Sequence, residues 1–159
     1  MPLKIIFDNW VGYWTWNRHI ESSMPLMVPA GWVRGRAYFT VHQDGLHYHE
    51  QGEWFTDNGL VYAIQRDYYY RYDPIQERIL YWAVNPLGRI ECLQVLTLQP
   101  AVAGSSEQQL SCQAVCGDDY YQATYTFPGN NLFTQFRLRY QVSGPKKAYC
   151  VTSYFYRCN

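Results

Sequence analysis

Short segments of alternating apolar and polar residues, each ended by turn-forming residues, run through most of the chain. This period of two predicts β-strands with one buried face, because successive side chains in a strand point to opposite sides of the sheet. No helical period persists beyond about one turn, near residues 5–10. The alternation predicts strands over residues 11–18, 33–42, 46–56, 60–72, 78–84, 88–98, 109–116, 119–127, 132–142 and 147–157.

The spacing of these strands limits the fold to one class. About ten strands joined mainly by tight turns, with no helices to cover a sheet, predict an all-β antiparallel up-and-down barrel, since closure removes exposed sheet edges. Two longer connections interrupt the pattern, over residues 21–31 and 99–108. There is no internal repeat or linker, so we expect residues 1–159 to form a single β-barrel domain.

Charge and cysteine content narrow the class of protein further. The 13 basic and 13 acidic residues cancel, so we expect neither nucleic acid nor a membrane as the main partner. The N-terminal "MPLKIIFDNW" has only a short apolar run, and no signal peptide or spanning segment is expected from it. Without a CxxC pair, the cysteines are expected to be reduced, mostly buried thiols of a cytoplasmic protein; they are Cys92, Cys112, Cys116, Cys150 and Cys158.

Three histidines on the first predicted hairpin raise the question of a metal site. A two-residue turn at Asp44-Gly45 places His42 opposite His47, with His49 diagonal to it on the outer face. Glu53 is about 13 Å further along the strand, too far to complete the set. A convex, wet surface with three imidazoles can bind a stray divalent ion, but we expect no functional metal and no cofactor.

The second hairpin decides which side chains point into the barrel. A three-residue loop over 57–59 places Glu50 opposite Arg66, whereas a two-residue turn would set Glu50 against Asp67, two like charges. The three-residue loop also makes the apolar faces of the two strands coincide. We therefore expect Tyr48 and Glu50 to point inward and the histidines to point outward.

The same parity, continued along the chain, predicts a mostly apolar interior. Its inward set is Leu80, Trp82, Val84, Ile90, Cys92, Leu96, Leu98, Leu110, Cys112, Ala114, Cys116, Asp119, Tyr121, Ala123, Tyr125, Phe127, Leu132, Thr134, Phe136, Leu138, Tyr140 and Val142. Glu50, Arg66 and Asp119 are the charged residues on this otherwise apolar inward face. They need a partner there, because burying an unpaired ionised group costs several kcal/mol.

Two interpretations of these inward charges stay open. They form either a salt-bridge network that fills the barrel or the polar end of a ligand cavity, in which Arg66 binds a carboxylate or other anion. A barrel of eight or more strands is wide enough for one small ligand, which favours the cavity. The candidate ligand-binding residues are Tyr48, Glu50, Arg66, Tyr68, Tyr70, Asp119, Tyr121 and Tyr125.

The two ends of the chain carry a signal for barrel closure. Gly12-x-Trp14 begins the first predicted strand and Arg157 ends the last one. In a closed barrel these strands are neighbours, so Arg157 is expected to stack on the Trp14 indole as a cation–π pair. This combination resembles the lipocalin and wider calycin pattern.

Six fragments, in order along nearly the whole chain, resemble the calycin-like family catalogued as domain of unknown function 6314. They are "GYWTWNR", "GRAYF", "YHEQG", "RDYYY", "CGDDYY" and "VSGPKKAY…YFYR". The resemblance implies a barrel and no established activity. A histidine often stands two residues before the cysteine in the family, where this chain has Ala114. The resemblance also singles out Lys146, Lys147 and Tyr149. They lie in a turn that is either solvated or a gate contacting an anionic ligand or partner.

The sequence therefore predicts a barrel that binds a small, partly apolar, anionic molecule. Two alternatives remain. One is an enzyme of isomerase, cyclase or hydrolase type that uses Glu50 or Asp119 as a general acid or base. The other is a non-catalytic interaction module with a filled core. No Ser-His-Asp or Cys-His arrangement is apparent, so no catalytic residue is assigned and an enzyme is the less expected outcome.

Overall fold

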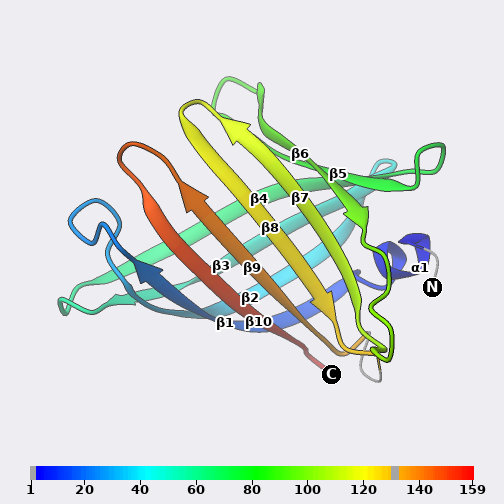
Figure 1. Ribbon diagram of the computed structural model, residues 1–159, viewed down its shortest axis with the longest axis horizontal. Coiled ribbons are helices and arrows are strands. Elements are labelled where there is room, and N and C mark those ends of the chain that lie inside the picture. Colours follow the sequence, from blue (N-terminus) through cyan, green and yellow to red (C-terminus); the bar gives the residue numbers. More distant parts are fainter. Residues whose placement is uncertain (1–2, 130–132) are drawn as a thin grey trace.

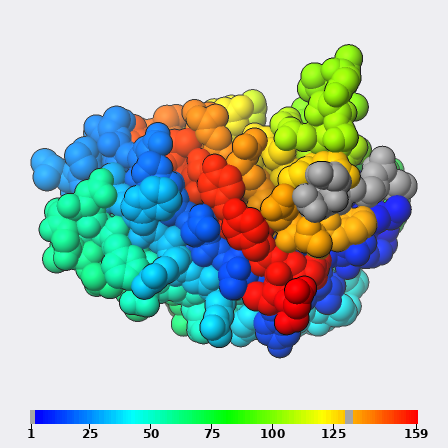
Figure 2. All heavy atoms as spheres, turned by 90° about the horizontal axis from the view of Figure 1, so that it is seen from below, coloured from blue at the N-terminus to red at the C-terminus, as the bar shows by residue number. Residues whose placement is uncertain are grey.

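The computed structural model describes residues 3–129 and 133–159, and within them it has one short helix and ten strands. In chain order these are α1 (Leu3–Asp8), β1 (Gly12–Ser22), β2 (Gly31–His42), β3 (Gly45–Thr56), β4 (Val61–Asp73), β5 (Arg78–Val84), β6 (Ile90–Leu98), β7 (Gln108–Cys116), β8 (Asp119–Phe127), β9 (Gln135–Ser143) and β10 (Ala148–Arg157). The strands are antiparallel and close into a barrel, with β1 beside β10 (Figure 1). The blue N-terminal and red C-terminal parts of the chain lie side by side on the face seen in Figure 2. The predicted fold class is confirmed.

Most predicted strands agree with the structure to within a few residues. The largest difference is in β1, which continues to Ser22 instead of ending at residue 18, with Ile20 buried inside the barrel. The predicted start of the ninth strand, at Leu132, lies outside the described residues. None of the described helices is long and apolar enough to cross a membrane.

The β2–β3 turn lies one residue earlier than predicted. His42 pairs with Gly45, and His47 pairs with Thr40 instead of His42, so the predicted opposition of His42 and His47 is wrong. Gly45 is needed inside the strand, because a Cβ there would lie 2.2 Å from the backbone oxygen of Tyr70. The shift moves the register by two residues, which leaves every side chain on its predicted face.

The β3–β4 register is as predicted. Glu50 pairs with Arg66, Tyr48 pairs with Tyr68, and Gly59 in the loop has a φ of 87°. Glu50 and Tyr48 are both buried, at 3% and 5% exposure.

In β5 the predicted parity is wrong. Ile79 and Tyr81 are buried in the barrel, whereas Trp82 stacks on Tyr69 at 6.2 Å on the outer face. The run Ile79–Val84 is apolar at every position. Alternation therefore carries no information about which face is inside.

One end of the barrel is closed by the N-terminal segment. The helix α1 buries Leu3, Ile6 and Phe7, and the Trp10 indole that follows stacks on Phe39 at 5.4 Å. We call this the closed end, and we call the opposite end, which carries the β1–β2, β3–β4, β5–β6, β7–β8 and β9–β10 connections, the open end (Figure 1).

The predicted contact between the first and last strands is present. Trp14 pairs with Arg157, and the guanidinium carbon lies 4.3 Å from the centre of the Trp14 ring system. Arg157 also donates hydrogen bonds to backbone oxygens of Asn9, Val11 and Phe133. A Cβ at Gly12 would lie 2.6 Å from the guanidinium, so a glycine is needed beside it.

The wall of the barrel is weakest around β6. The β6–β7 ladder has two pairs, Thr97 with Ser111 and Leu98 with Leu110. A disulfide joins Cys92 of β6 to Cys116 at the end of β7. The expectation that all five cysteines are reduced is therefore wrong for these two. Their pairing depends on how β6 and β7 meet in space, which residues 24 apart in sequence do not reveal.

Candidate functional site

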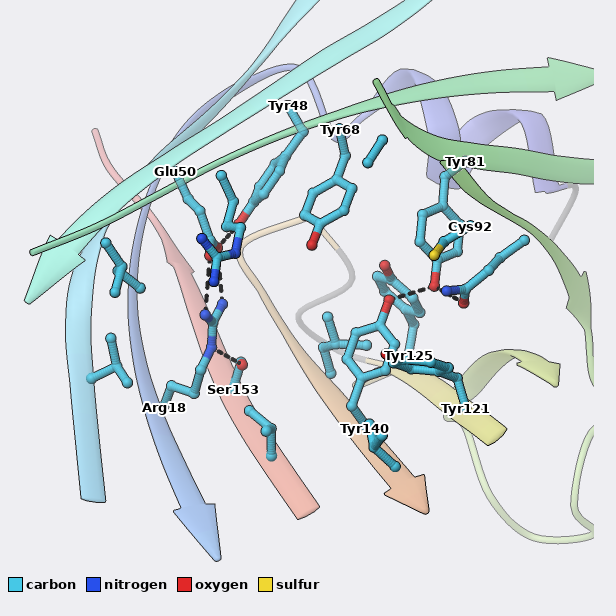
Figure 3. A pocket seen from close by; sticks show the side chains of 18 of the residues that line it. Arg18, Tyr48, Glu50, Tyr68, Tyr81, Cys92, Tyr121, Tyr125, Tyr140 and Ser153 are labelled. Carbon is cyan, nitrogen blue, oxygen red and sulfur yellow. Dashed lines mark hydrogen bonds and ion pairs between the residues drawn. The ribbon is translucent and has the colours of Figure 1, made fainter. Parts of the chain in front are cut away.

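A cavity of about 390 Å³ occupies the barrel between its closed end and its open end (Figure 3). Its walls are mainly aromatic and aliphatic. It reaches solvent at the open end, because Arg66, Glu91 and Cys92 line it and are also exposed. The sequence left two interpretations open, a filled barrel and a cavity. The structure has the cavity, so the barrel is not filled by its own side chains.

A buried ion pair lies on one side of the cavity. The Arg18 guanidinium donates to both oxygens of the Glu50 carboxylate, from Nη1 at 3.0 Å and from Nη2 at 2.8 Å (Figure 3). Its Nε donates to the Ser153 hydroxyl at 2.8 Å, and the Tyr48 hydroxyl donates to Glu50. Glu50 is paired with Arg66 along the backbone, as predicted, but it forms its ion pair with Arg18.

Two glycines explain why Arg18 reaches Glu50. Gly35 and Gly52 are paired across β2 and β3, and a Cβ on either would lie within 3.0 Å of the Trp16 ring. The indole therefore lies against bare backbone. Arg18 stacks on Trp16 at 4.3 Å, which aims its guanidinium along the cavity wall toward Glu50.

The ion pair keeps the carboxylate ionised despite its burial. Burial by itself would raise the pKa of Glu50, but the charge of Arg18 and the hydrogen bonds from Arg18 and Tyr48 outweigh it and lower the pKa below its ordinary value. Burial would likewise lower the pKa of Arg18, and Glu50 holds it above its ordinary value. Arg18 and Glu50 are therefore both ionised, and their charges cancel.

Four tyrosines form a second polar group on the other side of the cavity. The Tyr70 and Tyr125 hydroxyls lie 3.1 Å apart, and the Tyr81 hydroxyl is hydrogen-bonded to both Tyr140 and Gln94. Burial raises the pKa of Tyr81, Tyr125 and Tyr140 well above the ordinary value. These hydroxyls therefore keep their protons, and each is already hydrogen-bonded within one of two pairs, Tyr70 with Tyr125 and Tyr81 with Tyr140.

Arg66, Tyr68 and Trp54 line the cavity, and each has a donor N–H or O–H group without a hydrogen-bond acceptor among the described residues. Among the described residues, Arg66 donates only to the backbone oxygen of Gln65, and no carboxylate lies within ion-pair distance of it. The Tyr68 hydroxyl points into the cavity (Figure 3), and no hydrogen bond joins it to another residue in the described part of the chain. The Trp54 Nε1 is buried without a hydrogen-bond partner in the described part of the chain. Burial, helped by the charge of Glu50, raises the pKa of Tyr68 and keeps its proton in place.

The predicted gate residues lie at the open end. Lys147 is 3.4 Å from Asp119, and Asp119 is not part of the cavity wall. Lys146 is exposed, whereas Tyr149 lines the cavity. Burial, and then Tyr121, raises the pKa of Tyr149 to about 12. The structure thus separates Asp119 from the other predicted ligand-binding residues.

Sequence reasoning missed the residue that contacts Glu50. Arg18 has the same parity as Gly12, Trp14 and Trp16, and that signal would have placed it inside the barrel. Ser153 gives no comparable signal, because a single serine in a strand is not distinctive. Tyr81 was missed because the wrong face of β5 was taken as inward.

The histidines lie on the outer face. Asp67 Oδ1 is 2.8 Å from His47 Nε2 and 2.8 Å from His49 Nδ1. Partial burial would raise the pKa of Asp67, but its hydrogen bonds to His49 and His47 lower it. Within residues 3–129 and 133–159, no group of three or more His, Cys, Asp or Glu side chains is arranged to hold a metal ion.

Comparison with known proteins gives a family and a fold. A family model described as "Family of unknown function (DUF6314)" matches residues 10–157. No curated protein matches the chain. A similar solved structure is the "Crystal Structure of Rv2717c from M. tuberculosis", with a TM-score of 0.64 and 14% sequence identity, which covers 100% of this chain and 99% of that one. At this identity the likeness concerns the fold alone.

Proposed function

Because the chain belongs to the family of unknown function DUF6314, whose description names no activity, we propose a function from the cavity itself: the barrel binds one small, partly apolar, anionic molecule in its lumen. The volume of about 390 Å³ is within the range of small-molecule sites. Aromatic and aliphatic walls suit an apolar body. The start of β1 and the stacked Arg157 also support the calycin type of barrel predicted from the sequence.

The balance of hydrogen-bonding groups supports an acceptor-rich ligand. Both oxygens of Glu50 are occupied, and Gln94 Oε1 already accepts from Tyr81 and Cys112. Apart from the exposed Glu91 at the mouth, the charged or polar side-chain groups left over are donors, namely the guanidinium of Arg66 and the hydroxyl of Tyr68. A ligand that supplies acceptors would satisfy them, and one that supplies only donors would not.

The charge of Arg66 is the observation that carries the anionic assignment. The Arg18–Glu50 pair is neutral as a unit, and Glu91 is an exposed residue hydrogen-bonded by Asn85. Arg66 therefore adds a positive charge at the cavity mouth that no carboxylate of the described residues compensates at ion-pair distance. An anion on the ligand would form charge-assisted hydrogen bonds there.

The enzyme alternative is less well supported. A general acid needs a proton to donate, a general base needs a free lone pair to accept one, and either works best with a pKa near the operating pH. The carboxylate of Glu50 has a lowered pKa and is saturated with hydrogen bonds, while Asp119 is paired with Lys147 outside the cavity wall. Neither carboxylate lies unpaired against the aromatic walls.

Two related fluorescent probes test the proposal. One is the anion 8-anilino-1-naphthalenesulfonate, and the other is N-phenyl-1-naphthylamine, which lacks the sulfonate. We expect both to bind with one-to-one stoichiometry. Arg66→Gln should weaken binding of the sulfonate about 10- to 100-fold, the value of a charge-assisted hydrogen bond of about 1.5–3 kcal/mol, and leave the neutral probe unaffected. Arg137→Gln, at an exposed arginine outside the cavity wall, is the matched control.

The outcomes separate the alternatives. Equal loss of both probes in Arg66→Gln would contradict anion recognition. If neither probe binds, or if both bind and Ile64→Trp, which places bulk in the cavity wall, leaves their binding unchanged, the lumen is not the binding site. Native mass spectrometry of the purified protein adds an independent check, because a retained small molecule would appear as an added mass.

A further inference from the structure

The outer part of the β5–β6 hairpin lacks the ladders that hold the other strands in the wall. Toward the open end, the β4–β5 ladder stops at Tyr69 with Trp82. The two β6–β7 pairs lie at the far end of β6, at Thr97 and Leu98. In the described part of the chain, residues 83–92 therefore have ladder partners only within their own hairpin, such as Ala83 with Glu91.

The disulfide crosses the gap that this leaves. Cys92 and Cys116 have Cα atoms 5.7 Å apart and link the hairpin to β7 at a point where the two strands are not hydrogen-bonded. Cys92 lines the cavity (Figure 3). Ala83 and Glu91 of the same hairpin line it as well. It is also exposed to solvent. The bond thus lies at the entrance of the cavity, and a thiol in solution can reach it.

We propose that the Cys92–Cys116 disulfide is a redox-sensitive clamp on the cavity entrance. When it is intact, the hairpin is held against β7 and a bound molecule leaves slowly. When a low-molecular-weight thiol reduces it, residues 83–92 separate from β7 more often and the molecule exchanges faster. The effect on ligand exchange rests on the function proposed above; the effect on hairpin mobility does not.

The chemistry is thiol–disulfide exchange with two equivalents of the small thiol. The first thiolate attacks the sulfur of Cys92, the more exposed residue of the two, forms a mixed disulfide there and releases the thiolate of Cys116, which takes up a proton. The second thiolate attacks the sulfur of the small thiol in the mixed disulfide and releases Cys92 as its thiolate. The protein gains two electrons and two protons, and the two small thiols leave as their disulfide.

The rest of β6 stays anchored when the clamp opens. Gln94 is 6% exposed and accepts hydrogen bonds from the Tyr81 hydroxyl and the Cys112 thiol inside the barrel. Leu96, the next inward residue, is fully buried. Reduction is therefore expected to loosen the tip of the hairpin and to leave the barrel closed.

Amide hydrogen exchange tests the clamp without any ligand. In peptides covering residues 83–93, we expect exchange to become about tenfold faster on reduction with dithiothreitol, which corresponds to local opening made easier by about 1.4 kcal/mol. In Cys92→Ser the same peptides should exchange as fast as those of the reduced wild-type protein, and adding thiol should not change their rate. Cys158→Ser removes an exposed free thiol near the C-terminus and should respond like wild type. Unchanged exchange, or alkylation of Cys92 and Cys116 before any reductant is added, would overturn the clamp.

A second measurement addresses the entrance. Stopped-flow dissociation of 8-anilino-1-naphthalenesulfonate should be faster in the reduced protein and in Cys92→Ser. Equal rates for oxidised and reduced protein would overturn control of access. Faster hairpin exchange in a protein that binds no probe in either state would reject the proposed function and leave the conformational clamp standing.

Discussion

Replacing Arg18 by Met removes the guanidinium bonded to both oxygens of the buried Glu50 carboxylate. Methionine keeps an apolar chain against Trp16 but donates no hydrogen bond. Glu50 is 3% exposed, and the Tyr48 hydroxyl would be its remaining hydrogen-bond partner among the described residues. Leaving a buried charge without its partner costs about 3–5 kcal/mol, so we expect the free energy of unfolding to fall by that amount at pH 7.

The pH dependence of this loss has a defined sign. In the wild type the pKa of Glu50 is lowered from its ordinary value of 4.5, so the pair stabilises the fold above that pH and loses its contribution as pH falls through the folded pKa. In Arg18→Met the charge and hydrogen bonds of Arg18 are lost, so burial outweighs the remaining hydrogen bond from Tyr48 and raises the pKa of Glu50. The folded variant then binds the proton more tightly than the unfolded chain. The difference in stability between the two proteins should shrink as pH falls toward 4.

Guanidinium or urea denaturation, followed by tryptophan fluorescence at pH 7 and pH 4, measures both effects. A loss of about 3–5 kcal/mol corresponds to a Tm lowered by roughly 6–20 °C for a chain of this size. Arg137→Met is the matched control, because this arginine is exposed on β9. The double variant Arg18→Met/Glu50→Gln should recover most of the stability. The reasoning is refuted if Arg18→Met is within about 0.5 kcal/mol of wild type at pH 7, or if the double variant is no more stable than the single.

Two further substitutions test the parts that position the site. In Gly52→Ala the new Cβ meets a backbone oxygen at 2.3 Å and Trp16 at 3.0 Å, so calorimetry should show a loss of about 1–3 kcal/mol; an unchanged Tm would contradict the packing. Arg157→Met removes hydrogen bonds to three carbonyls and the contact with Trp14, and denaturation should show a loss of about 2–3 kcal/mol that Arg137→Met does not reproduce.

Where the sequence alternates, it predicts the structure well. The inward face of β3 and the pairing of Glu50 with Arg66 follow from apolar parity and from the cost of opposing two like charges. The stacking of Arg157 on Trp14 follows from the closure of the first strand on the last. In β5 the same method fails, because the apolar run Ile79–Val84 has no polar residue to mark the outside.

The contacts inside the cavity are of a different kind. Whether Glu50 bonds to Arg66 on the adjacent strand or to Arg18 two strands away depends on the space left by Gly35 and Gly52 and on the stacking of Arg18 over Trp16. Backbone pairing constrains neighbouring strands, but it leaves the direction of a long, flexible side chain open.

The sequence alone determined that this chain forms strands, which faces are buried in most of them, and that the barrel closes, because these properties are local or concern adjacent strands. The tertiary structure decided that Glu50 is neutralised by Arg18, that Arg66 has no carboxylate of the described residues at ion-pair distance, and that Cys92 meets Cys116. Those outcomes depend on the distance between β1 and β3, which are not adjacent, and on the distance between β6 and β7 at the weakest part of the wall. Such distances arise only once all ten strands are in place, since residues remote in sequence meet there.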